Sequence, residues 1–317
     1  MAKKDPGQKF EAAYLKTYRG GRLREKIEKS FQIMESCTLC PRSCGVNRLR
    51  GEKGVCRAGL DPEVSSYSPH FGEESPLVGR HGSGTIFFTH CNLRCSFCQN
   101  YSISHLGEGV MISAEKLAGM MVELQKLGCH NLNFVSPSHY VPQILKALPV
   151  AIEAGLSAPL VYNTGGYDAF ETLKLLDGVV DIYMPDFKFS RSEPAEEFCH
   201  APDYPPSAKT AIKEMHRQVG DLVLDEKGVA LRGLLVRHLV LPGGLAGTED
   251  VMRFLAEEIS RNTYLNIMDQ YHPCGDIQWS SLLSRRISAG EFQSAVDAAK
   301  REGLTRLDLR ERFRIIF

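Results

Sequence analysis

The sequence has no long apolar run and no excess of charge of either sign. No stretch of about 18 consecutive apolar residues occurs, so a membrane-spanning helix is not predicted. The start, Met-Ala-Lys-Lys-Asp-Pro-Gly-Gln, lacks the apolar segment of a secretory signal peptide. Lysine plus arginine number 38, as do aspartate plus glutamate, which disfavours a nucleic-acid binder. We therefore expect a cytoplasmic protein with no membrane or nucleic-acid partner.

Cysteine is present, but its distribution is not that of a disulfide framework. Seven of the ten cysteines fall in two groups with the spacing of metal ligands, which is typical of metal binding in a reducing compartment. The other three, Cys129, Cys199 and Cys274, are scattered, and each is expected to be a small buried apolar residue. The two groups are therefore the candidate metal sites.

Three cysteines in a CxxxCxxC loop follow a predicted strand at residues 85–89. They are Cys91, Cys95 and Cys98. Three thiolates are one too few for a closed tetrahedral zinc site. In a cubane [4Fe-4S] cluster, three cysteines hold three irons and leave the fourth iron open to an external ligand. The loop therefore predicts an open cluster as a reaction site, and a zinc knuckle completed by His90 or His105 is the alternative.

Four more cysteines lie in a short glycine-rich stretch ahead of that strand. They are Cys37, Cys40, Cys44 and Cys56. No apolar core could hold so irregular a segment by itself, so four soft ligands here imply a metal. The spacing fits a closed structural zinc site, which is the preferred interpretation, but an auxiliary iron-sulfur cluster uses the same ligands.

Strands and helices alternate about six times beyond residue 82. The predicted strands cover residues 85–89, 131–135, 159–166, 179–188, 232–242 and 263–268. Helices are predicted between them, one capped by Ser113 and another beginning at Ser207. Residues 57–83 are predicted to be a connector. Such alternation indicates an α/β fold built of parallel βαβ units.

Polar residues stand at nearly every predicted strand end. Ligands of α/β barrels bind at the carboxyl ends of the strands, so these residues predict one convergent polar site. They are Ser136, Ser138 and His139 after the second strand, Asn163 and Thr164 after the third, Asp186 and Lys188 after the fourth, Arg237 and His238 in the fifth, and Gln270 and Tyr271 after the sixth.

The cysteine loop resembles the hallmark of the radical S-adenosylmethionine (SAM) superfamily, CxxxCxΦC, in which Phe97 matches the aromatic Φ. The resemblance implies a [4Fe-4S] cluster and SAM as cofactors, a partial (β/α)6 TIM-like barrel, and an external electron donor such as flavodoxin or ferredoxin. It also implies that SAM is cleaved reductively and that a 5′-deoxyadenosyl radical takes hydrogen from a substrate. The implied cofactor contacts are Phe97, Ser136, Ser138, His139, Asn163, Asp186, Lys188, Arg237 and His238.

Three parts of the chain are then expected. Residues 1–82 form N-terminal helices and the four-cysteine metal-binding segment, and residues 83–275 form the partial barrel. Residues 276–317 form a C-terminal helix, which Ser288 caps, and a tail.

Within the superfamily the chain is similar to pyruvate formate-lyase activating enzymes, from Cys37 to about Tyr271, and especially to short members with an N-terminal Cys-Pro-Arg-x-Cys-Gly block. Those enzymes abstract hydrogen from a glycine of a partner glycyl radical enzyme, and Asp186 and Lys188 match their Asp-x-Lys strand end. Binding of the SAM carboxylate or sulfonium region and a structural salt bridge at the barrel mouth are the two alternative roles of this pair. Two features differ: Ser-Pro-Ser-His at residues 136–139 replaces the usual Gly-Gly-Glu, and a ferredoxin-like insertion is absent. The expected substrate is therefore a protein glycine or a small molecule.

Two other functions fit the cysteine groups. An electron carrier or redox sensor would hold iron-sulfur clusters in both groups without SAM chemistry. A zinc-stabilised interaction scaffold would hold zinc and no iron.

Overall fold

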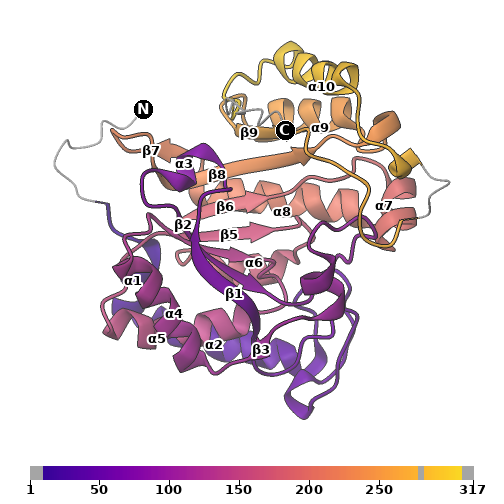
Figure 1. Ribbon diagram of the computed structural model, residues 1–317. Helices are drawn as coiled ribbons and strands as arrows, with labels where there is room; N and C mark the ends of the chain where they lie inside the picture. Colours follow the sequence, from indigo (N-terminus) through magenta and orange to yellow (C-terminus); the bar gives the residue numbers. More distant parts are fainter. Residues whose placement is uncertain (1–9, 278–281, 309–317) are drawn as a thin grey trace.

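The computed structural model describes residues 10–277 and 282–308, and its centre is a sheet whose main body is six parallel strands. These strands are β2 (Ser83–Phe88), β4 (Leu132–Val135), β5 (Leu160–Thr164), β6 (Ile182–Pro185), β8 (Ala230–Leu239) and β9 (Tyr264–Met268). Each is hydrogen-bonded to the next in chain order. Figure 1 shows β8, β6 and β5 side by side across the middle of the molecule. The predicted α/β class with parallel βαβ units is confirmed, and no ladder among the described residues closes β9 onto β2.

The register of the parallel strands brings their carboxyl ends to one edge. Phe87 of β2 pairs with Val135 of β4, Val135 pairs with Asn163 of β5, and Asn163 pairs with Met184 of β6. The residues that follow these strands therefore lie along the same edge, as expected for parallel pairing.

The prediction that residues 57–83 are a connector is wrong. They contain β1 (Glu63–His70), which pairs antiparallel with β2, and the short helix α3 (Ser75–Val78). The two-residue strand β3 (Val110–Met111) pairs with β1, and β7 (Val223–Leu224) pairs with β8. Most side chains of β1 are partly or fully exposed, so its serine-rich sequence lacks the apolar alternation that would have predicted a strand.

The helices follow the predicted positions with one exception. They are α1 (Ala13–Arg19), α2 (Arg22–Ile33), α4 (Ala114–Lys126), α5 (Val141–Glu153), α6 (Phe170–Leu176), α7 (Ser192–Cys199), α8 (Tyr204–Val219), α9 (Thr248–Phe254) and α10 (Ala289–Arg301). The Ser113 hydroxyl accepts a hydrogen bond from the Lys116 amide, and Ser288 forms a capping box with Glu291, as the sequence predicted.

The exception is the proline-rich stretch before residue 207. The helix predicted to begin at Ser207 begins at Tyr204, and α7 precedes it. Pro205 stands in the first turn of α8, where a proline costs the helix no hydrogen bond. Proline at this position therefore marks the start of a helix and not a loop.

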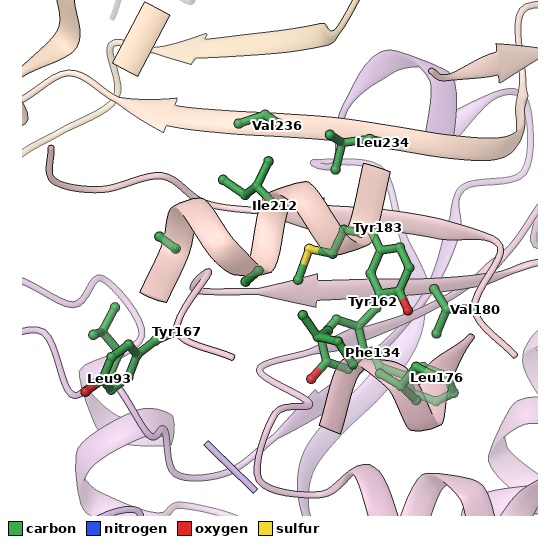
Figure 2. Packing of buried hydrophobic residues seen from close by; sticks show 14 of the residues in the cluster. Leu93, Phe134, Tyr162, Tyr167, Leu176, Val180, Tyr183, Ile212, Leu234 and Val236 are labelled. Atoms are coloured by element: carbon green, nitrogen blue, oxygen red, sulfur yellow. The ribbon is translucent and has the colours of Figure 1, made fainter. Parts of the chain in front are cut away.

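The core lies between the sheet and its helices. Figure 2 shows Leu234 and Val236 of β8 near Ile212 of α8, with Tyr183 and Tyr162 in the same cluster. The rings of Tyr162 and Tyr183 meet edge to face at 5.7 Å. No described helix has the length and apolar character needed to cross a bilayer. Of the predicted C-terminal tail, Leu307 bridges to Leu265, and residues 309–317 lie outside the described part of the chain.

Replacing Leu234 with alanine tests this core. Leu234 is fully buried, so Leu234→Ala should lower the free energy of unfolding by about 2–5 kcal/mol through lost burial and the cavity left behind. Urea unfolding followed by circular dichroism would measure the change. Leu127→Ala is the control, because Leu127 is 56% exposed at the end of α4 and its truncation should leave the unfolding midpoint nearly unchanged.

Candidate functional site

A cavity of about 980 Å³ lies at the carboxyl edge of the parallel strands. It is lined by the cysteines of the loop after β2 and by polar residues of the following strands. From the sequence-predicted set these are Cys91, Cys95, Phe97, Cys98, Ser136, Asn163, Thr164, Asp186, Lys188, Arg237 and Gln270. The volume is large enough for a cofactor and a small substrate together.

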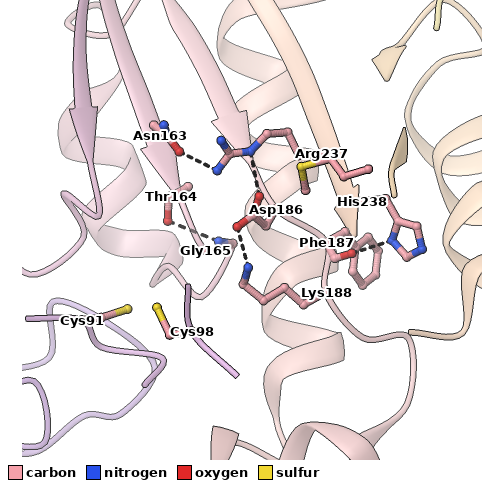
Figure 3. Close-up of polar contacts among 12 residues, drawn as sticks. Cys91, Cys98, Asn163, Thr164, Gly165, Asp186, Phe187, Lys188, Arg237 and His238 are labelled. Atoms are coloured by element: carbon pink, nitrogen blue, oxygen red, sulfur yellow. Dashed lines mark hydrogen bonds and ion pairs between the residues drawn. The ribbon is translucent and has the colours of Figure 1, made fainter. Parts of the chain in front are cut away.

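The three loop cysteines differ in exposure. Cys95 is 7% exposed, whereas Cys91 and Cys98 are half-buried, and Figure 3 shows the Cys91 and Cys98 thiols pointing toward each other. Burial, followed by the neighbouring Cys95, raises the pKa of the Cys91 thiol to about 12. Ser104 donates a hydrogen bond to the Cys98 sulfur at 3.1 Å. Hydrogen bonds to ligand sulfurs are one of the ways in which proteins set cluster potentials.

A buried ion network stands across the cavity from the loop (Figure 3). Asp186 accepts from the Lys188 ammonium at 2.7 Å and from Arg237 Nε at 2.8 Å. Arg237 Nη2 also donates to the Asn163 side-chain oxygen at 2.6 Å. Burial acts to raise the pKa of Asp186, but Arg237 and Lys188 outweigh it and hold that pKa below its usual value. Asp186 is therefore charged and binds both cations.

The backbone around Asp186 is tightly packed. Gly166, in the turn after β5, has a φ of +78°, and a side chain at this position would collide with the Asp186 carbonyl oxygen. Only glycine satisfies both conditions. The glycine at position 166 thus allows the turn after β5 to approach the end of β6 closely.

Three predicted cofactor contacts do not line the large cavity: Ser138, His139 and His238. The Ser138 hydroxyl lies 3.1 Å from that of Thr164, behind the cavity wall. His238 is fully buried between the Phe187 carbonyl and the Thr248 hydroxyl, and burial lowers its pKa to about 4. His139 lies against the N-terminal cysteines, and burial lowers its pKa to about 3. Both imidazoles are therefore neutral near pH 7.

The remaining predicted side chains flank the cysteine loop. Phe97 is 3% exposed, and its ring meets those of Phe189, Phe198 and Tyr271 edge to face at 5.9–6.3 Å. Ser136 has a φ of +57°, which is rare for a residue other than glycine. Such outliers cluster at functional sites.

Two of the scattered cysteines lie beside the loop, which the sequence did not predict. The Ser96 amide donates to the Phe198 carbonyl, and a hydrogen bond with Cys199, followed by burial, raises the pKa of Cys95. The Cys274 thiol donates to the Phe97 carbonyl at 3.3 Å. Each partner is separated from the loop by about a hundred residues or more, so no local pattern could have found these contacts.

Two acidic residues of the cavity wall were also missed. Glu73 and Glu74 precede α3 and line the cavity, and the Glu74 carboxylate accepts from the Asn266 amide at 2.9 Å. Burial raises the pKa of Glu74. Both residues lie in the segment wrongly predicted as a connector.

The N-terminal cysteines surround a second, much smaller cavity of about 10 Å³. All four of them line it, together with Arg48 and His139. Arg48 is 1% exposed and donates to the His139 and Gly59 carbonyls at 2.7 Å each. Burial, followed by the nearby Cys56, raises the pKa of the Cys40 thiol to about 12.

Within residues 10–277 and 282–308, no group of three or more histidine, cysteine, aspartate or glutamate side chains is placed to hold a metal ion. The loop after β2 still suits a cluster, because each thiolate of a cubane site binds a different iron and the sulfurs do not converge on one atom. Its donor set, three thiols at the wall of a roomy cavity, is the set that an open cluster requires.

Replacing Asp186 with asparagine tests the ion network. The two buried cations would lose their counter-ion, so Asp186→Asn should lower the free energy of unfolding by about 3–5 kcal/mol. Because the folded-state pKa of Asp186 is lowered, its contribution is present above about pH 4 and is lost as the pH falls below that value.

Thermal unfolding measured across pH would test both effects. The stability of the variant should fall less steeply than that of the unaltered protein as the pH is lowered below about 4. Asp250→Asn serves as the control, with little change expected, because Asp250 is exposed and makes only an ion pair with Arg253 and a long hydrogen bond with Ser190 among the described contacts. Equal stability of Asp186→Asn and the unaltered protein would contradict the assigned network.

Comparisons with known proteins find two relatives in sequence and two solved structures that align with part or most of the chain. No protein-family model matches the chain. A radical SAM methyltransferase from Sphaerobacter thermophilus aligns over 93% of this chain and 91% of its own, with a TM-score of 0.49 and 12% identity. Native anSMEcpe with bound AdoMet aligns over 67% of this chain and 57% of its own, with a TM-score of 0.46 and 13% identity.

Two proteins of Methanocaldococcus jannaschii are similar in sequence. The uncharacterized protein MJ0808 is 24% identical over 262 residues, which cover 75% of this chain and 70% of that protein. The uncharacterized protein MJ0674 is 32% identical over 288 residues, which cover 88% of this chain and 78% of that protein. The chain belongs to the same protein family as MJ0674.

Proposed function

We propose that this protein is a radical SAM enzyme whose cluster binds at Cys91, Cys95 and Cys98. The observation that carries the proposal is that these three thiols and Phe97 line one large cavity together with polar strand ends. When bound, the reduced [4Fe-4S] cluster supplies the electron that cleaves SAM reductively and so enables hydrogen abstraction from a substrate. In this proposal the open six-strand sheet is a partial (β/α)6 barrel.

The residues of the cavity divide into two roles in this proposal. Phe97 provides an apolar surface beside the cluster for the adenine of SAM, and Ser136 and Asn163 provide hydrogen-bonding oxygens. Lys188 and Arg237, held by Asp186, provide fixed positive charge for a carboxylate. Ser138, His139 and His238 support the wall from behind and do not contact the cofactor.

The substrate in this proposal is a protein glycine or a small molecule, as for the activating enzymes that the sequence resembles. The Asp186 and Lys188 strand end supports that branch, and an external donor such as flavodoxin or ferredoxin would supply the electron. For the N-terminal cysteines we propose structural zinc. All four thiols line one small cavity and are the donor set of a closed zinc site, although in the described structure they do not yet converge on a single point.

A second candidate function is electron transfer or redox sensing by a fully ligated cluster. The contact between Cys199 and Cys95 favours it, because Cys199 could provide a fourth thiolate. However, Cys199 is 1% exposed and does not line the large cavity. Its thiol is therefore on the packed side of the loop, away from the open space where the fourth iron would face SAM.

Anaerobic SAM cleavage decides between these functions. The reconstituted protein, reduced with dithionite, should convert SAM to 5′-deoxyadenosine and methionine, and Cys95→Ala should abolish the conversion because one cluster ligand is lost. Chromatography of the products would measure it.

Two variants complete the SAM experiment. Cys199→Ala should retain cleavage, whereas loss of the cluster in this variant would favour the fully ligated alternative. Cys129→Ala is the matched control, since Cys129 is buried between α4 and β4 and lies outside both cysteine groups. SAM turnover by Cys95→Ala would contradict the proposal.

Metal analysis tests the N-terminal site separately. The purified protein should carry about one zinc per chain, and Cys37→Ser should lose that zinc because a closed site needs four ligands, while the iron bound near Cys91 is retained. Elemental analysis by mass spectrometry would measure both metals. Iron in place of zinc, lost selectively in Cys37→Ser, would indicate a second cluster.

A further inference from the structure

Arg42 connects the two cysteine groups. It lies between Cys40 and Cys44 in the sequence, but its guanidinium reaches out of the N-terminal block to the loop after β2. It is half-buried, and it meets backbone carbonyls from two other parts of the chain. Arg42 itself does not line the large cavity, although Leu93, one of its hydrogen-bond acceptors, does.

Four carbonyl oxygens accept from this one side chain. Arg42 Nε donates to the Asn92 carbonyl at 3.0 Å, and Nη2 donates to the Leu93 carbonyl at 3.0 Å. Nη2 also donates to the Cys199 carbonyl at 2.6 Å, and Nη1 donates to the His200 carbonyl. The guanidinium carbon stands 5.4 Å from the centre of the Tyr167 ring. The guanidinium is thus fixed by four carbonyl acceptors and by an aromatic face.

All four acceptors are backbone carbonyls, so their position in the fold matters and their residue type does not. Asn92 and Leu93 lie between the proposed cluster ligands Cys91 and Cys95, so two hydrogen bonds fix the backbone of that segment. Cys199 ends α7, where carbonyls have no partner within the helix and the helix dipole is negative. A planar guanidinium with several N–H donors can bond to the loop carbonyls and to the carbonyls at the end of α7 at the same time. A lysine ammonium cannot span both sets in one plane.

Further contacts join the same three segments. The Asn92 side chain lies beside the Cys40 thiol, so the N-terminal block and the loop meet at a second point. The Asn92 amide donates to the Tyr167 carbonyl at 2.6 Å. His200 has a φ of +48°, an unfavourable conformation that its contact with Arg42 stabilises.

We propose that the N-terminal four-cysteine block is a metal-dependent clamp on the cluster loop, and that Arg42 is the positioning residue through which it acts. The inference rests on the proposed metal sites of both groups. The metal fixes the backbone on either side of Arg42, and Arg42 fixes residues 92 and 93 and the end of α7 that packs on Cys95. The clamp sets the loop geometry without contacting the cluster or SAM.

Arg42→Lys tests the clamp, with Arg50→Ala as the matched control because Arg50 is an exposed arginine of the same block. Hydrogen exchange of the peptide over residues 89–98, measured by mass spectrometry on the full-length protein, should be at least about tenfold faster in Arg42→Lys. The reduced cluster's electron paramagnetic resonance signal and midpoint potential should shift in the same variant with its iron content unchanged. Arg50→Ala should match the unaltered protein in both measurements.

The role of the metal proposed at the N-terminal cysteines is tested in two ways. One is the Cys37→Ser variant, and the other is zinc chelation of the unaltered protein. Both should accelerate exchange of the same peptide. Unchanged exchange in Arg42→Lys, equal acceleration in Arg50→Ala, or no effect of metal removal would overturn the clamp. If no cluster binds at Cys91, the proposed function fails, but the exchange comparison still decides whether Arg42 holds the loop.

Discussion

The parallel register of the six strands is the constraint on which the site depends. Phe87, Val135, Asn163 and Met184 pair across four strands, so the chain leaves each strand at the same level. The cysteine loop, Ser136, Thr164 and Asp186 therefore meet although they are far apart in the sequence. A shift of register by one residue would turn these side chains to the opposite face of the sheet.

Backbone strain is concentrated where the cysteines are. Six residues other than glycine have a positive φ in the described part of the chain. They are Ser43 and Arg57 in the N-terminal block, His90 and Arg94 in the cysteine loop after β2, Ser136 at the next strand end, and His200 beside Arg42. Each such residue costs roughly 1–2 kcal/mol, so the surrounding contacts must impose these conformations. Contacts with other parts of the chain therefore hold the N-terminal block and the cysteine loop after β2 in these conformations.

The two cysteine groups differ in their surroundings in a way that matches different tasks. The N-terminal thiols enclose about 10 Å³ and are backed by buried Arg48, whereas the loop thiols face about 980 Å³ of open space and an ion network. A closed pocket suits a metal that only stabilises structure, and an open one suits a metal that must meet a substrate. Arg42 connects the two groups through its hydrogen bonds to the Asn92 and Leu93 carbonyls, as the proposed clamp requires.

The sequence by itself determined most of the helices and strands and predicted a metal-binding role for the cysteine loop. The spacing of three thiols after an apolar strand, the helix caps at Ser113 and Ser288 and the six-fold alternation are local patterns, and local patterns survive in a single sequence. The sequence did not predict strand β1 or helix α7, because serine and proline residues interrupt the periodic pattern of apolar residues there.

Only the tertiary structure decided which polar strand ends share the cavity. Neighbouring residues on a strand point to opposite faces, so Arg237 joins Asp186 while His238 turns away to Phe187 and Thr248. Only tertiary structure, too, placed Cys199 beside Cys95 and Arg42 against residues 92 and 93. Contacts between residues so far apart in the chain depend on how the elements pack, and no spacing in the sequence records that.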